Sequence, residues 1–152
     1  MISLAEALAW MRLSSFSGRN SFGLNLELLT EHLPTAFDLL KELTAHPVFP
    51  LEEIAIVKKN MKAAIRRRED NIFQMTTYVL KETLFQKHPF RLEPGGTMES
   101  VDRITREDLV DFYGQFAVPR NMVLSVFGNI EAKEVLKNIK GMFGEVEDQK
   151  VA

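Results

Sequence analysis

Glu31 and His32 are the neighbouring residues whose types come nearest to a zinc-binding pair. They match the last two letters of H-x-x-E-H, in which two histidines on one helix face bind zinc and the glutamate acts as general base. The first histidine of that motif would fall at position 28, which is Leu28. Leu28 belongs to an alternating, strand-like stretch, whereas the motif needs a helix. We therefore interpret Glu31-His32 as an ordinary pair at the start of a helix.

The histidines His46 and His88 each precede a proline. A metal role for His88 would require Glu82 or Glu93 to converge on it. We expect instead that His88 and its proline fix a loop that Phe90 anchors in the core. His46 is interpreted as a helix terminator, because the residue before a proline is pushed out of the α region.

Other candidate constellations have simpler interpretations. Arg66, Arg67 and Arg68 are able to grip phosphate or an acidic peptide, but the dipole at a helix C-terminus favours positive charge, and we interpret them as a cationic helix end. The stretch 95–97, Gly-Gly-Thr, lacks the lysine and the preceding strand of a phosphate loop. No Ser/His/Asp triad can be assigned, because nothing in the sequence places such residues together.

Several elements must position these residues. Residues 22–28 alternate apolar and polar side chains, which predicts a strand with one buried face, and residues 12–17 are its expected hairpin partner. A short helix is expected over 3–10. Thr30 is expected to cap the next helix, with Pro34 in its first turn and residues 46–50 at its end.

A longer helix is predicted over 51–68, followed by a break at Asp70-Asn71 and a further helix over 72–86. Residues 91–96 read as a loop. Thr105 begins another helix, because its hydroxyl is able to accept from the N–H of Asp108. Residues 122–127 are nearly all apolar, which predicts a strand covered on both faces, and a last helix is expected over 131–142. This order of strands and helices predicts an α+β fold.

The composition excludes some classes of protein. The 152 residues are 45% apolar, with a formal net charge of -2, so a dedicated nucleic-acid binder is disfavoured. There is no cysteine, which excludes a thiolate nucleophile and a disulfide framework and leaves the cytoplasm and the periplasm both open. No apolar run is long enough for a membrane span, and residues 1–10 do not read as a signal peptide.

Taken in order, several segments resemble the pitrilysin/insulinase family of zinc metallopeptidases, which includes the mitochondrial processing peptidases. They are Ser-Gly-Arg-Asn-Ser-Phe-Gly at 17–23, His-Pro-Phe at 88–90, Gly-Gly-Thr-Met-Glu-Ser at 95–100, Thr-Arg-Glu-Asp-Leu at 105–109, and Pro-Arg-Asn-Met-Val-Leu-Ser-Val-Phe-Gly-Asn at 119–129. The resemblance implies a processing-peptidase/LuxS-like domain, present in part, with an antiparallel sheet packed against several helices. It implies that residues 1–104 are the later part of one such domain and that 105–152 open the next with a helix, a strand and a helix.

The chain departs from the catalytic pattern of this family at each zinc ligand. H-x-x-E-H does not occur, and aligning the helix break places Ala64 where the family has its third ligand, a glutamate. A register shifted by five would place Glu69 there, but Glu69 follows three arginines and reads as a surface residue. A catalytic zinc needs three protein ligands and an open position for water. We therefore expect no catalytic residue, no metal ligand and no cofactor in this chain.

The resemblance implies a non-catalytic domain that forms a chamber wall and helps to position peptide for a zinc-bearing half, on the same polypeptide or a partner subunit. By analogy with the catalytic half, an edge strand at Phe22, Gly23, Leu24, Asn25 and Leu26 is the expected peptide-binding site. Pairing of that strand wholly within its own sheet is the simpler alternative. A second hypothesis is a structural scaffold of the same fold, and a third is a truncated catalytic domain. An exposed sheet edge also allows the chain to form a homodimer.

Overall fold

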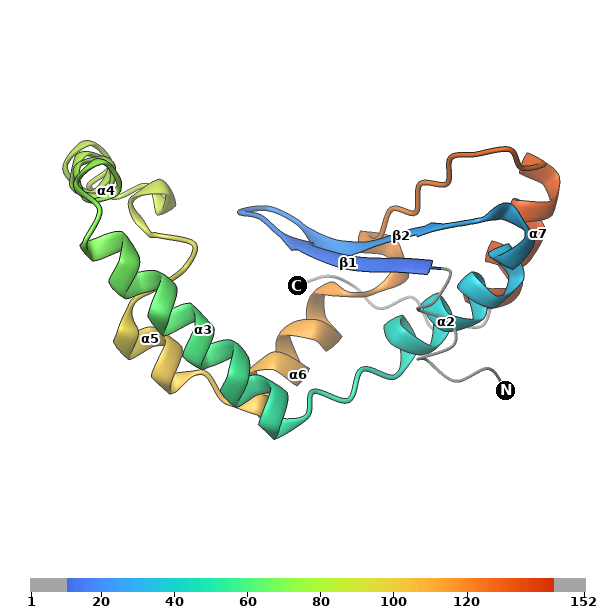
Figure 1. Ribbon diagram of the computed structural model, residues 1–152, viewed down its shortest axis with the longest axis horizontal. Coiled ribbons are helices and arrows are strands. Elements are labelled where there is room, and N and C mark those ends of the chain that lie inside the picture. Colours follow the sequence, from blue (N-terminus) through green and yellow to red (C-terminus); the bar gives the residue numbers. More distant parts are fainter. Residues whose placement is uncertain (1–10, 144–152) are drawn as a thin grey trace. The chain divides into compact units, whose positions relative to one another are not determined.

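A computed structural model of the protein describes residues 11–143, and these divide into two compact units. Among the described residues, one unit comprises 11–48 and 113–143, and the other comprises Phe49–Phe112. The helix expected over 3–10 lies outside the described residues. Figure 1 shows the described elements along the chain, and each unit is described by itself below.

The first unit is built on a β-hairpin, as the alternating sequence predicts. Strand β1 (Met11–Ser17) pairs antiparallel with β2 (Phe22–Leu28), in a register that sets Met11 opposite Leu28 and Ser17 opposite Phe22. Met11 is buried against Ala36, with Leu26 and Leu28 packed beside them. The hairpin therefore buries one face at its open end, where period-two side chains meet a helix.

Two helices complete the packing of this unit. A 3-10 turn, η1 (Thr30–His32), leads into α2 (Leu33–Ala45), and α7 (Ala132–Phe143) packs against α2. Phe37 of α2 and Val135 of α7 are buried in a cluster that also contains Leu33, Leu40, Val126, Ile130 and Ile139. The cap predicted at Thr30 is wrong, because α2 begins at Leu33 after η1 and no side chain caps either element. The stop before Pro47 is confirmed.

The second unit begins with α3 (Leu51–Glu69), which ends at Asp70 and is followed by α4 (Ile72–Leu84). Asn71 separates the two helices because its side chain caps α4, accepting from the N–H of Gln74 at 3.1 Å. The predicted break is therefore confirmed, although α4 ends two residues earlier than expected. A 3-10 turn, η2 (Pro89–Arg91), packs against α4.

A short helix that the sequence did not predict, α5 (Met98–Arg103), packs against α3. Val101 of α5 and Ile65 of α3 are the most buried side chains of this unit, at 1% and 3% exposed. The next helix, α6 (Arg106–Phe116), begins after the predicted cap. The Thr105 hydroxyl accepts from the N–H of Asp108 at 3.1 Å, and the Thr105 N–H donates to the Asp108 carboxylate at 2.7 Å.

The strand expected over 122–127 does not form. After the 3-10 turn η3 (Pro119–Asn121) the chain is extended, with Met122 at φ -105° and ψ 145°, but no strand among residues 11–143 pairs with it. Strand structure requires hydrogen bonds to a neighbour, and apolar sequence alone does not supply one. The class is nonetheless α+β as predicted, with a two-stranded antiparallel sheet and helices.

Candidate functional site

The predicted peptide-binding residues lie on β2, whose one strand partner among the described residues is β1. The far edge of β2 therefore carries no strand in the part of the chain that the structure describes. Phe22 and Leu24 are 42% and 39% exposed, and Gly23 and Leu26 are half-buried. An extended edge with exposed apolar side chains is chemically suited to adding a peptide strand.

Phe16 and Gly23 form a cross-strand pair near the turn of the hairpin. A methyl group added at Gly23 would lie 2.8 Å from Cε1 of Phe16, so the ring covers the space that a side chain would occupy. An aromatic ring over a strand glycine compensates for the missing side chain. The ring of Phe16 therefore covers the backbone of Gly23 on one face of the hairpin.

Glu31 and His32 do not form a metal site. They lie on η1, with His32 Nε2 3.6 Å from Glu31 Oε1, and Leu28 lies on β2 rather than on the same helix face. Within residues 11–143 no three His, Asp or Glu side chains come together as a metal-binding group.

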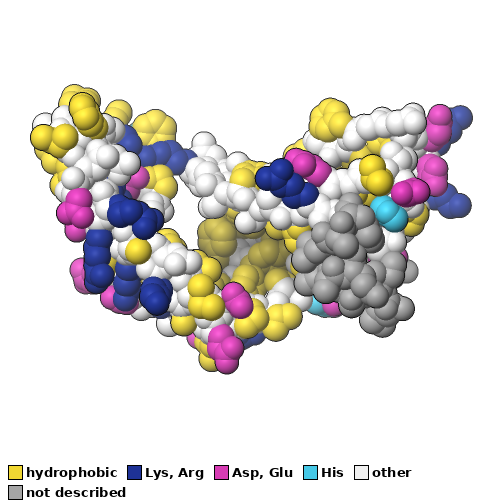
Figure 2. All heavy atoms as spheres, viewed as in Figure 1, with side chains coloured by type: hydrophobic (Ala, Val, Ile, Leu, Met, Phe, Trp, Pro, Cys, Tyr) yellow, Lys and Arg dark blue, Asp and Glu magenta, His cyan; other side chains and the backbone are white. Residues whose placement is uncertain are grey.

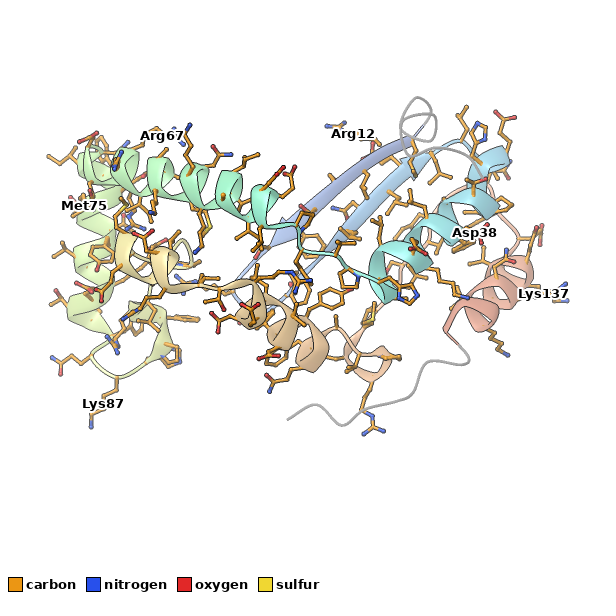
Figure 3. All side chains as sticks on the ribbon, turned by 90° about the horizontal axis from the view of Figure 1, so that it is seen from below. Arg12, Asp38, Arg67, Met75, Lys87 and Lys137 are labelled. Atoms are coloured by element: carbon orange, nitrogen blue, oxygen red, sulfur yellow. The ribbon has the colours of Figure 1, made fainter. Side chains whose placement is uncertain are left out.

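Ala64, the position of the third zinc ligand in the family pattern, lies on an exposed part of α3. It lines an open hollow of about 580 Å³ together with Arg67, Asp70, Asn71 and Gln74. Figure 3 shows Arg67 on the side of α3 that faces away from α5. The hollow offers one carboxylate and a guanidinium, a set that does not fit a zinc site. Glu69 is exposed at the end of α3.

His88 has a structural role, as the sequence indicates, but the expectation that Phe90 anchors the loop in the core is wrong, because Phe90 is 47% exposed. The Nδ1 of His88 accepts from the N–H of Phe90 at 3.2 Å, and the His88 ring packs edge-on against Phe90 with 4.6 Å between centroids. The carboxylates considered as its metal partners are engaged elsewhere. Glu82 accepts from the Tyr78 hydroxyl at 2.8 Å, and Glu93 lies 3.9 Å from Lys81. The hydrogen bond between the Tyr78 hydroxyl and Glu82 raises the pKa of Tyr78.

Arg68 differs from Arg66 and Arg67 because it contacts other segments of the fold. The sequence analysis did not predict this role. Its guanidinium donates to the Gly96 carbonyl at 3.4 Å and lies 5.4 Å from the centre of the Tyr78 ring. Gly96 has φ +70°, a conformation that favours glycine, and its loop is held close to α3 by this contact. Arg66 and Arg67 are exposed, so the cationic helix end predicted from sequence describes these two.

Comparison with known proteins identifies the fold. The sequence profile of the Peptidase M16 inactive domain matches residues 103–152. The last third of the chain is therefore similar to the M16 peptidase family. This confirms the resemblance to the pitrilysin/insulinase metallopeptidases, and specifically to their inactive domain.

Relatives include both proteases and proteins named for other roles. The chain is 28% identical over 116 residues to the non-peptidase homolog YmxG of Helicobacter pylori, covering 76% of this chain and 27% of that protein. It is 23% identical over 111 residues to the zinc protease YmfH of Bacillus subtilis, covering 73% and 26%. It is 26% identical over 127 residues to mouse cytochrome b-c1 complex subunit 1, covering 82% and 26%.

Solved structures show the same fold. The peptidase M16 inactive domain from Pseudomonas fluorescens superposes with a TM-score of 0.79 at 18% identity, covering 97% of this chain and 36% of that chain. The chain thus spans about a quarter to a third of its curated relatives, from 26% to 33%. Its fold is similar to that of part of the peptidase M16 inactive domain. None of the helices described is long and apolar enough to cross a membrane.

Proposed function

We propose that this chain acts as the non-catalytic side of a two-part zinc peptidase, forming a chamber wall and helping to position peptide for a zinc-bearing half. Zinc and the general base would come from that half, on the same polypeptide or a partner subunit. The observation that carries the proposal is the far edge of β2, which has no strand partner among the described residues and exposes Phe22 and Leu24.

An extended peptide would add to β2 along Phe22, Gly23, Leu24, Asn25 and Leu26. Main-chain hydrogen bonds would supply affinity, and alternate side chains would supply preference. Residues 1–104 would be the later part of one processing-peptidase-like domain and 105–152 the start of the next. The reaction itself, attack of water on a peptide carbonyl, would involve no residue of this chain.

The test is reconstitution with the zinc-bearing half. The tagged chain is purified from its source cells, and co-purifying polypeptides are sequenced for H-x-x-E-H. Peptide hydrolysis is then measured for that polypeptide alone and with this chain. We expect hydrolysis to need both, and hydrolysis that is equal with and without this chain would contradict the proposal.

Leu24→Ser in that complex tests the edge strand. We expect KM for peptide to rise about ten-fold, a loss of ~1.4 kcal/mol of binding, with little change in kcat. Leu29→Ser is the matched control, because Leu29 is 62% exposed just beyond β2. Equal KM values for the two variants would contradict the proposal that peptide binds along β2.

A structural scaffold is the second candidate, favoured by the likeness to cytochrome b-c1 complex subunit 1. It predicts stable assembly with subunits that lack H-x-x-E-H and no effect of this chain on peptide hydrolysis. Sequencing the co-purifying polypeptides therefore separates the two candidates.

A further inference from the structure

The loop at 85–92, which follows α4, is closed by a hydrogen bond that requires a neutral histidine. His88 precedes η2, and its Nδ1 lies 3.2 Å from the backbone nitrogen of Phe90. A backbone N–H only donates, so this Nδ1 accepts and carries no proton, and the proton of the neutral ring lies on Nε2. The closed loop therefore holds His88 in one protonation state and one tautomer.

Three aromatic rings pack together around this hydrogen bond. The centroid of the His88 ring lies 4.6 Å from that of Phe90 and 5.9 Å from that of Phe85, and the Phe85 and Phe90 rings meet edge-on at 5.8 Å. Phe85 follows α4 directly, and η2 packs against α4. Because His88 contacts both phenylalanines, its bond with the Phe90 amide also holds the loop against the end of the helix.

The charged groups around His88 offer it no counter-ion. The other titratable side chains of α4, of the loop and just beyond it are Tyr78, Lys81, Glu82, Lys87, Arg91 and Glu93. Tyr78 and Glu82 bond each other at 2.8 Å, Lys81 lies 3.9 Å from Glu93, and Lys87 points out from the loop (Figure 3). No carboxylate of residues 11–143 forms an ion pair with His88, so none stabilises a proton gained by its ring.

We infer that His88 is a pH-sensitive latch, which holds the loop at 85–92 against α4 when it is neutral and releases the loop when it is protonated. An imidazolium carries an N–H on both ring nitrogens and accepts at neither. In the closed loop its Nδ1–H would face the N–H of Phe90 across 3.2 Å, so this geometry is lost. Histidines change charge between about pH 8 and pH 5, which sets the range of the latch. The inference does not depend on the proposed function.

The experiment measures hydrogen exchange of the Phe90 amide by NMR in the full chain at pH 8 and pH 5, expressed as protection relative to an unstructured peptide at the same pH. We expect protection to fall at least about five-fold at pH 5, because a hydrogen bond of typical net strength shifts an equilibrium by about that factor. The Ile65 amide, in the buried core of the same unit, should keep its protection.

His88→Asn separates the protonation of His88 from other effects of pH. An asparagine oxygen accepts from the N–H two residues later and is favoured before a helical turn, and the amide side chain does not titrate. We expect this variant to protect the Phe90 amide equally at pH 8 and pH 5. His46→Asn is the matched control, because His46 also precedes a proline but lies at the end of α2 in the other unit, and it should keep the full pH response.

Several results would overturn the latch. Equal protection of the Phe90 amide at both pH values in the unaltered chain, or the same loss of protection in His88→Asn, would show that protonation of His88 does not open the loop. Higher protection at pH 5 would show that attraction between the imidazolium and the phenylalanine rings outweighs the lost bond. A parallel fall at Ile65 would assign the change to unfolding of the whole unit.

Discussion

At the scale of single residues, Asp108 shows how a cap links sequence to stability. The Thr105 N–H donates to its carboxylate at 2.7 Å and the Thr105 hydroxyl at 2.9 Å, and these bonds lower the pKa of Asp108 from its usual 3.8. A carboxyl whose pKa is lower in the folded state than in the unfolded state stabilises the fold at pH values above its unfolded-state pKa. That stabilisation is lost as the pH falls through the folded-state pKa.

We therefore predict that Asp108→Asn lowers the urea midpoint of unfolding at pH 7. The difference in urea midpoint between the variant and the unaltered chain should become smaller below about pH 4. Asp111→Asn, on the same helix and exposed, controls for the loss of one negative charge. A gap that stays constant from neutral to acid pH would show that the charge of Asp108 does not act through the cap.

Tyr113 provides a second test at this scale. Its hydroxyl donates to the Thr44 carbonyl at 2.9 Å, and burial raises the pKa of Tyr113 above 10.0. We predict that Tyr113→Phe lowers the free energy of unfolding by about 1 kcal/mol. The advantage of the tyrosine is full below about pH 10 and is lost as pH rises through the higher folded-state pKa.

Tyr78→Phe is the control for this change, because the Tyr78 hydroxyl bonds Glu82 one turn away on an exposed part of α4. Such a pair contributes only about 0.2–0.5 kcal/mol. Equal losses in the two variants would mean that the contact between Tyr113 and Thr44 adds nothing beyond a surface bond.

At the scale of elements, α5 packs against α3, and the two helices carry the buried side chains Val101 and Ile65 of the second unit. We predict that Ile65→Ala costs about 2–4 kcal/mol, from lost burial and the cavity left behind. Ile56→Ala on the same helix should cost less than about 1 kcal/mol, because Ile56 is 53% exposed and Ile65 is 3% exposed. Urea unfolding of both variants checks this, and similar losses would contradict the assigned core.

The sequence predicted those elements whose signals are local. Alternation predicted β1 and β2, Pro47 marked the end of α2, and Asn71 separated α3 from α4. Helix α5 has six residues, too few for apolar periodicity. Its signal was the reciprocal cap between Thr97 and Ser100, with bonds of 2.8 and 3.2 Å.

The elements that could not be predicted depend on contacts distant in sequence. Residues 122–127 have the sequence of a strand, but pairing requires a neighbour that residues 11–143 do not supply. The same holds at the candidate site. Ala64 and His88 could be interpreted from neighbouring residues, whereas the bond from Arg68 to Gly96 joins residues 28 apart and has no local signature.

At the scale of the whole molecule, many large apolar side chains of the described residues are exposed. In one unit Phe73 and Ile72 of α4 are 82% and 75% exposed, and in the other Val123 and Phe127 are 93% and 92% exposed. Figure 2 shows hydrophobic side chains on the surface. Contiguous exposed apolar patches mark interaction sites, whereas singly exposed apolar side chains are common on protein surfaces.

The measurement that tests the central claim most directly is the zinc content of the purified chain, after dialysis against excess zinc and then metal-free buffer. Because H-x-x-E-H is absent and Ala64 occupies the third ligand position, we predict less than about 0.1 equivalent of zinc per chain. Retention of about one equivalent would contradict the assignment as a non-catalytic partner, and substitution of Glu31, His32, Glu69 and His88 would then identify the ligands.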